Sequence, residues 1–261
     1  MNTRHLLCLA AGALLCNGLS AQSTPATADQ PPSHYTVGTG FDFSRGHYSL
    51  ATATDVLSVP LTLGYERGPW TFEVRIPWMR IEGPATVVSG GGASPVRPTA
   101  AAESGVGDTL LSGTYRLGGN PGGLNTAATI RAKLPTASES RGLGTGEADF
   151  SGQFDFHRSF GAVTPFASVG YAALGDSSLY QLEDGPYASG GAHFRASDST
   201  VFTAAFNWRH RYFAGGEHGR DALLAVTYDL GPRWRVLLYG LKGFSDASPD
   251  HGGGLSATCR F

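Results

Sequence analysis

The chain has 261 residues, among them 37 glycines, and 11% of it is aromatic while only 15% is Asp, Glu, Lys or Arg, against about 25% in ordinary soluble domains. A formal net charge of −2 excludes the basic surface that a nucleic-acid partner requires. Many glycines and aromatic residues with few charges favour an all-β chain with an apolar outer surface.

Residues 1–21 have the pattern of a secretory signal peptide, with Arg4 before an apolar run and a small-residue end at Ala21, where we place cleavage. Cleavage removes Arg4 and so leaves 18 basic against 21 acidic residues, a net charge of −3. It also removes two of the three cysteines, so only Cys259 remains. The mature chain therefore forms no internal disulfide. The alternative of a lipoprotein anchored at Cys16 is disfavoured, because bulky Leu15 stands where a small residue is expected.

Residues 22–34 are rich in Thr, Ala and Pro and are expected to form a flexible periplasmic arm. Beyond the leader no run approaches the roughly 20 apolar residues of a membrane helix. A chain of this kind can therefore cross a membrane only with strands.

From residue 35 to residue 261 the chain repeats one unit, about ten residues of alternating polarity followed by Gly, Pro, Asn or Asp. This pattern predicts an antiparallel up-and-down transmembrane β-barrel of about twelve strands. The expected strands are 35–44, 55–66, 70–82, 106–117, 124–136, 149–160, 163–175, 186–197, 200–213, 221–230, 233–245 and 253–261.

The second and third strands fix their own register, because a two-residue turn at Gly68 and Pro69 determines the partners by subtraction. One face is then wholly apolar and the other polar. The expected apolar pairs are Tyr65 with Phe72, Leu63 with Val74, Leu61 with Ile76, and Val59 with Trp78. A hairpin of a soluble β-sandwich would show the same alternation.

Connection lengths favour the barrel over the sandwich, because short turns alternate with longer loops along the whole chain, as in outer-membrane barrels. We therefore expect a protein of the Gram-negative outer membrane, in contact with its lipids. The aromatic residues expected at the two membrane interfaces are Trp70, Phe72, Trp78, Tyr115, Phe154, Phe160, Trp208, Tyr212 and Tyr228.

The last strand ends in an aromatic residue, with Leu255, Ala257, Cys259 and Phe261 on one apolar face. Substrates of the outer-membrane assembly machinery resemble this pattern. Phe261 is therefore expected to act as an assembly signal recognised by that machinery.

Alternation also assigns the polar side chains that line the lumen. The residues expected there are Arg116, Arg131, Lys133, Asp155, His157, Asn207, Arg209 and Arg211. Arg209 and Arg211 could select anionic solutes, or they could pair with inward carboxylates and brace the wall. We favour the bracing role, because the lumen carries both signs of charge.

Two other classes of function remain open. Asp155, His157 and Ser168 share one inward face of neighbouring strands, the side-chain types of a lipid-modifying hydrolase, although no G-x-S-x-G motif occurs. An adhesive or structural barrel would instead use its external loops. No metal site or cofactor is expected.

Two segments, GVGDTLLSGTYRL at 105–117 and KLPTASESRGLGTGEADFS at 133–151, resemble the outer-membrane transporter family associated with the meta-pathway of phenol degradation. The resemblance implies a barrel that passes small, often aromatic or hydrophobic molecules, and carries no catalytic role. The motif residues, expected to form a network at the extracellular mouth, are Gly105, Gly107, Asp108, Lys133, Pro135, Thr136, Gly144, Gly146 and Asp149.

The function expected from these observations is a channel or transporter for the passive passage of small solutes, without an enzymatic activity. The long loop 83–105 is the expected plug of the lumen.

Overall fold

The computed structural model describes residues 33–88, 92–94, 101–118, 123–176 and 181–261. The expected signal peptide, 1–21, and residues 22–32 of the expected arm lie outside this part of the chain. Residues 33 and 34, expected in the arm, belong to the first strand.

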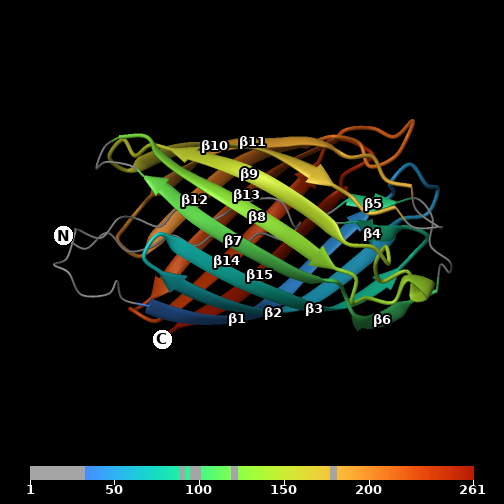
Figure 1. Ribbon diagram of the computed structural model, residues 1–261, viewed down its shortest axis with the longest axis horizontal. Coiled ribbons are helices and arrows are strands. Elements are labelled where there is room, and N and C mark those ends of the chain that lie inside the picture. The colour runs from blue at the N-terminus through green and yellow to red at the C-terminus, as the bar shows by residue number, and fades with distance from the viewer. Residues whose placement is uncertain (1–32, 89–91, 95–100, 119–122, 177–180) are drawn as a thin grey trace.

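The described residues form one antiparallel sheet that closes on itself, because the first strand pairs with the last (Figure 1). Each wall strand pairs with its neighbours in chain order, so the predicted twelve-stranded barrel is confirmed. The wall strands are β1 Ser33–Gly46, β2 Thr54–Arg67, β3 Trp70–Glu82, β7 Thr109–Gly118, β8 Asn125–Leu134, β9 Asp149–His157, β10 Val163–Ala173, β11 Gly185–Arg195, β12 Thr200–Arg209, β13 Gly219–Leu230, β14 Trp234–Gly243 and β15 His251–Arg260.

Short elements occupy the end of the barrel opposite the start of β1 and the C-terminus (Figure 1). They are the hairpin of β4 Thr86–Val88 and β5 Gly92–Ser94, strand β6 Glu103–Val106, and the single 3-10 turn Glu139–Arg141. In the part of the chain that is described, no helix is long and apolar enough to cross a membrane. The short turns lie at the same end of the barrel as the start of β1 and the C-terminus, and we assign this end to the periplasm. The opposite end is the extracellular mouth.

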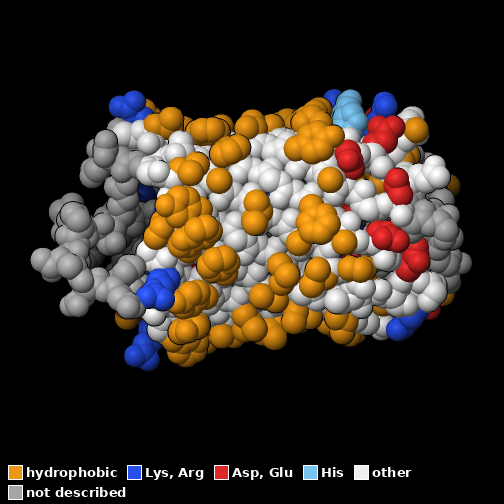
Figure 2. Space-filling model, viewed as in Figure 1, with side chains coloured by type: hydrophobic (Ala, Val, Ile, Leu, Met, Phe, Trp, Pro, Cys, Tyr) orange, Lys and Arg blue, Asp and Glu red, His pale blue; other side chains and the backbone are white. Residues whose placement is uncertain are grey.

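The register of the β2–β3 hairpin is the predicted one, with Tyr65 opposite Phe72 and Val59 opposite Trp78. These pairs lie on the outside of the barrel. Trp78 is 43% exposed there, and Ile130 on strand β8 is 72% exposed. Figure 2 shows apolar side chains spread over the wall while acidic side chains gather at the mouth. A wall with its apolar face outward requires lipid around it, which excludes the soluble sandwich.

Several strands end earlier than predicted, because the chain turns over the mouth or into a tight turn while its alternation continues. Phe160 closes a turn with Val163 beyond the end of β9. Strand β12 ends at Arg209. Tyr212, expected on the lipid face, is instead buried against Leu182 in the mouth loops, so its assignment as an interface aromatic was wrong.

Candidate functional site

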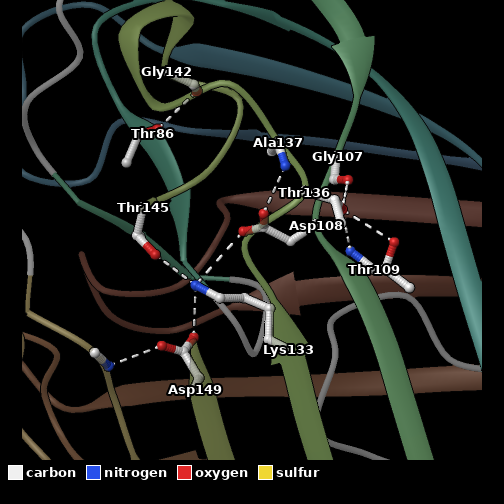
Figure 3. Close-up of polar contacts among 11 residues, drawn as sticks. Thr86, Gly107, Asp108, Thr109, Lys133, Thr136, Ala137, Gly142, Thr145 and Asp149 are labelled. Atoms are coloured by element: carbon white, nitrogen blue, oxygen red, sulfur yellow. Dashed lines mark hydrogen bonds and ion pairs between the residues drawn. The ribbon is translucent and has the colours of Figure 1, made fainter. Parts of the chain in front are cut away.

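The resembling motifs meet at the extracellular mouth, where Lys133 at the end of β8 is only 4% exposed (Figure 3). Its Nζ lies 2.9 Å from Asp149 Oδ2 and 3.5 Å from Asp108 Oδ2, and it also donates to the hydroxyl of Thr145. Burying an ammonium group is favourable only with such partners. We call Lys133, Asp108, Asp149 and Thr145 the mouth lock.

Asp108 lies at a β-bulge between β6 and β7. Strand β3 pairs with β7 up to Arg75 opposite Leu110, but with β6 from Trp78 opposite Val106, so one extra residue is inserted. The expected continuous strand 106–117 is therefore two strands. The bulge reverses which residues face inward: odd-numbered residues do so in β6, and even-numbered ones, whose parity Asp108 shares, do so in β7.

The loop between β8 and β9 is fastened to this bulge. The hydroxyl of Thr136 donates to the carbonyl of Gly107 over 2.9 Å and accepts the N–H of Thr109 over 2.9 Å. The N–H of Ala137 donates to Asp108 Oδ1 over 3.0 Å. Pro135 is exposed and lies between Leu134, the last residue of β8, and the hydrogen bonds of Thr136 and Ala137.

The same loop then folds into the mouth. Leu143 is buried against Val56, Met79 and Ile81 on the inner wall. The motif glycines provide the space: a Cβ at Gly105 would lie 3.0 Å from Leu143, one at Gly107 2.5 Å from the sulfur of Met79, and one at Gly144 2.6 Å from Asp108 Oδ2. Gly146 has a φ of +79°, which favours glycine.

The expected plug, loop 83–105, contacts this loop. The Thr86 hydroxyl donates to the carbonyl of Gly142 over 2.7 Å, and both Ala85 and Thr86 are fully buried. The rest of 89–100, apart from β5, lies outside the described residues. The two loops thus contact each other at the mouth, and the lock fixes the second of them.

Below the mouth, polar side chains cross the inner wall. Arg75 donates to Asp42 over 2.7 Å, and the hydroxyl of Tyr239 donates to the other carboxylate oxygen over 2.8 Å. Tyr239 reaches Asp42 over the intervening strand β15 because Gly254 has no side chain: a Cβ there would lie 2.6 Å from both groups.

A second group repeats the arrangement on β8 to β11. Arg131 donates to the Oε1 of Gln153 over 3.0 Å and to the hydroxyl oxygen of Tyr187 over 3.3 Å. The ring of Tyr187 lies over Gly170, where a Cβ would be 2.3 Å from its Cζ. We call the two groups, Asp42, Arg75, Tyr239, Arg131, Gln153 and Tyr187, the lumen belt.

The remaining expected lumen residues lie at various depths. Arg116 donates to the carbonyl of Gly68 at the periplasmic turn, and Asp155 accepts from Gln153. His157 ends β9 opposite Phe166. Asn207 donates to Asp221 over 2.5 Å.

The two arginines once considered for selectivity both have carboxylate partners. Arg209 lies 3.6 Å from Asp221 and places its guanidinium 5.0 Å from the ring centre of Tyr212. Arg211 lies beyond the end of β12, so its expected place on the strand was wrong; it donates to Glu183 over 2.6 Å. Its hydrogen bond holds the pKa of Glu183 below the ordinary range, and Glu183 in turn raises the pKa of Arg211.

Sequence reasoning missed four inward residues, Asp42, Asp221, Tyr187 and Tyr239. Asp42 stands between Phe41 and Phe43 on β1, so its parity alone could have placed it in the lumen. The two tyrosines gave a misleading signal, because aromatic residues in barrels are expected at the lipid interfaces.

The residues considered for a hydrolase have other partners. Ser168 lies opposite Asp155, as expected from the Gly161 turn, but its hydroxyl is 2.5 Å from that of Ser189. Asp155 accepts a hydrogen bond from the amide of Gln153 through its Oδ1.

No family model and no curated protein matches the chain. Among solved structures, an outer membrane channel from Pseudomonas putida F1 is similar over 92% of this chain and 100% of its own, with a TM-score of 0.69 and 13% identity. The NanC porin covers 86% of this chain and 98% of its own (TM-score 0.55, 6% identity), and the translocator domain of the autotransporter NalP from Neisseria meningitidis covers 90% of each (TM-score 0.50, 14% identity).

These similarities show the fold. The chain is a β-barrel of the bacterial outer membrane, and its apolar wall agrees with that location. A channel, a porin and a translocator domain share this architecture, so the fold does not determine the function. The function depends on the residues that line the inside of this barrel.

Proposed function

We propose that the protein is a passive channel of the outer membrane for small solutes. The observation that carries the proposal is the lumen belt, in which polar side chains of both charges are fixed on the inner wall by one another. A polar interior of this kind lines the water-filled channels of porins.

The belt is preorganised rather than mobile. Tyr239 and Tyr187 lie flat along the wall over Gly254 and Gly170, so their rings do not extend across the lumen. The hydroxyl of each tyrosine lies beside a charged partner, Asp42 for Tyr239 and Arg131 for Tyr187. This combination suits solutes that carry an aromatic or apolar part and a polar group.

A further feature supports such solutes. The inner face of β13 and β14 carries an apolar cluster of Leu223, Leu237 and Tyr239 with Ala225 packed against it. Together with the motifs at 105–117 and 133–151, it supports assignment to the transporter family associated with phenol degradation. In this proposal the mouth motif shapes the entrance and does not contact solute.

Arg209 and Arg211 act as braces in this proposal, since Asp221 and Glu183 neutralise them. Selectivity is then assigned to the belt, in which Arg131 is a partly buried cation. Phe261, whose N–H pairs with the carbonyl of Tyr35 while its ring is exposed, serves assembly through the outer-membrane machinery.

The test is solute entry into liposomes that contain the refolded barrel. A pentose and a small aromatic acid should enter, and a tetrasaccharide should not. Tyr239→Ala, which empties one side of the belt, should accelerate entry. Tyr228→Ala, on the outer wall, is the matched control and should leave the rate unchanged. Liposomes that admit neither small solute would contradict the channel.

A further inference from the structure

Two prolines face one another near the middle of the β2–β3 hairpin. Pro60 lies opposite Pro77, and both are buried in the wall. In a hairpin with a two-residue turn, Arg67 and Trp70 form a hydrogen-bonded pair and such pairs alternate along the ladder. Pro60 and Pro77 therefore form a non-bonded pair, whose ring nitrogens face the outer neighbours, β1 and the β6–β7 bulge.

The ladders on both flanks of the hairpin are interrupted at this level. Between β1 and β2 the pairing passes from Thr39–Leu61 to Asp42–Ser58, skipping the two positions that include Pro60. On the other flank the ladder passes from Arg75–Leu110 to Trp78–Val106 across the bulge. One hydrogen bond remains there, from Gly107 N–H to the Pro77 carbonyl over 2.8 Å.

The half of the hairpin above the prolines, residues 54–59 and 78–82, is thus bounded by two weakened points at one level. We call it the panel. Its β3 edge is held by four pairs to β6, a strand of four residues. Below the prolines the hairpin is paired without interruption to β1 and β7.

The part of the panel next to the prolines is apolar on its outer face, whereas Asp55, Arg80 and Glu82 lie on that face nearer the mouth. Val56, Met79 and Ile81 point inward and pack on Leu143 of the mouth loop. Val59, Trp78 and Val106 are exposed on the outside. An apolar solute that displaced Leu143 would meet Val56, Met79 and Ile81 on the inner face, and Val59 and Trp78 on the outer face next to the prolines.

We propose that the panel opens laterally, hinged at Pro60 and Pro77, and passes apolar solutes between the lumen and the membrane. The inference rests on the proposed channel function and adds a second exit to it. The mouth lock holds the panel closed through Leu143. Release of Leu143 and separation of the panel from β1 or β6 are parts of one motion.

Hydrogen exchange of the refolded barrel in lipid tests the motion without any solute. Amides of 54–59 and 78–82 should exchange at least tenfold faster than those of 61–67 and 70–76. Replacing both prolines, Pro60→Val and Pro77→Val, supplies the missing donors and should reduce that difference. Pro69→Ala, in the turn of the same hairpin, is the control and should not. Equal protection of the two halves in the wild-type barrel would overturn the proposal.

A disulfide tests the route. In a Cys259→Ser background, Phe43→Cys with Leu57→Cys joins the panel to β1 at a directly paired position. Oxidation should lower naphthalene uptake by cells carrying the barrel several-fold, with recovery on reduction, and should leave ion conductance unchanged. The matched lock Val37→Cys with Leu63→Cys, below the prolines, should affect neither.

If oxidation of the Phe43→Cys with Leu57→Cys disulfide leaves naphthalene uptake unchanged, lateral opening of the panel is overturned. Absence of ion conductance in the barrel without the disulfide would contradict the channel function. Lateral opening of the panel would then be judged by the exchange rates and the redox-dependent uptake alone.

Discussion

Replacing Lys133 by Met should destabilise the barrel far more than the loss of an exposed cation at the mouth. Methionine keeps the length of the side chain but leaves the carboxylates of Asp108 and Asp149 buried without their cation, at 10% and 5% side-chain exposure. Breaking a buried pair in this way costs about 3–5 kcal/mol. The matched control is Arg141→Gln, which breaks the ion pair to Glu103 at 48% and 26% exposure; an exposed pair contributes about 0–1 kcal/mol.

The assay is urea unfolding of the refolded barrel, followed by the difference in gel migration between folded and heated protein. Lys133→Met should lower the midpoint clearly and Arg141→Gln should barely change it. Adding Asp108→Asn and Asp149→Asn to Lys133→Met should recover most of the loss, because the charges are then removed together. Equal midpoints for the two single variants, or a triple variant less stable than Lys133→Met, would refute the lock.

Four further predictions concern the belt, the braces and the C-terminus. Gly254→Ala should alter single-channel conductance by displacing Tyr239, whereas Gly240→Ala, with open space around it, should not; equal traces would remove the belt from the conduction path. Arg209→Gln with Arg211→Gln should leave the reversal potential unchanged, and a shift toward cation selectivity would return both to a selectivity role. Because the pKa of Glu183 is lowered, its carboxylate should still bind Arg211 when the pH equals the ordinary pKa of a glutamate, and should release Arg211 only as the pH falls through the lowered value. Protease cleavage of residues 181–184 should therefore rise at that low pH in the wild type. In Glu183→Gln the cleavage should be high at every pH. Deleting Phe261 should lower the amount of heat-modifiable barrel in the membrane, and unchanged amounts would show that assembly does not read it.

The wall of the barrel could be predicted from the sequence because lipid and lumen select opposite polarity at alternate positions. The β2–β3 register followed from one two-residue turn. Strand ends could not be predicted in this way. Arg211 and Tyr212 continue the alternation of β12, but the chain leaves the wall after Arg209 to pack over the mouth.

Three of the four residues of the mouth lock were predictable, but Thr145 and the geometry were not. The motifs indicated that Asp108, Lys133 and Asp149 lie near one another, whereas the bulge between β6 and β7 leaves no clear mark in a single sequence. The contact of Tyr239 with Asp42 depends on Gly254 in a third strand. Such contacts across an intervening strand require the closed register of the whole barrel.

The central claim, that solutes pass through the lumen past the belt, is tested most directly by planar-bilayer recording of the refolded wild-type barrel. The account predicts discrete current steps, which a small aromatic acid added to one side reduces by occupying the belt, and an increase of the step in Tyr239→Ala. A barrel that inserts, shows the gel shift of the folded state and carries no current would contradict it.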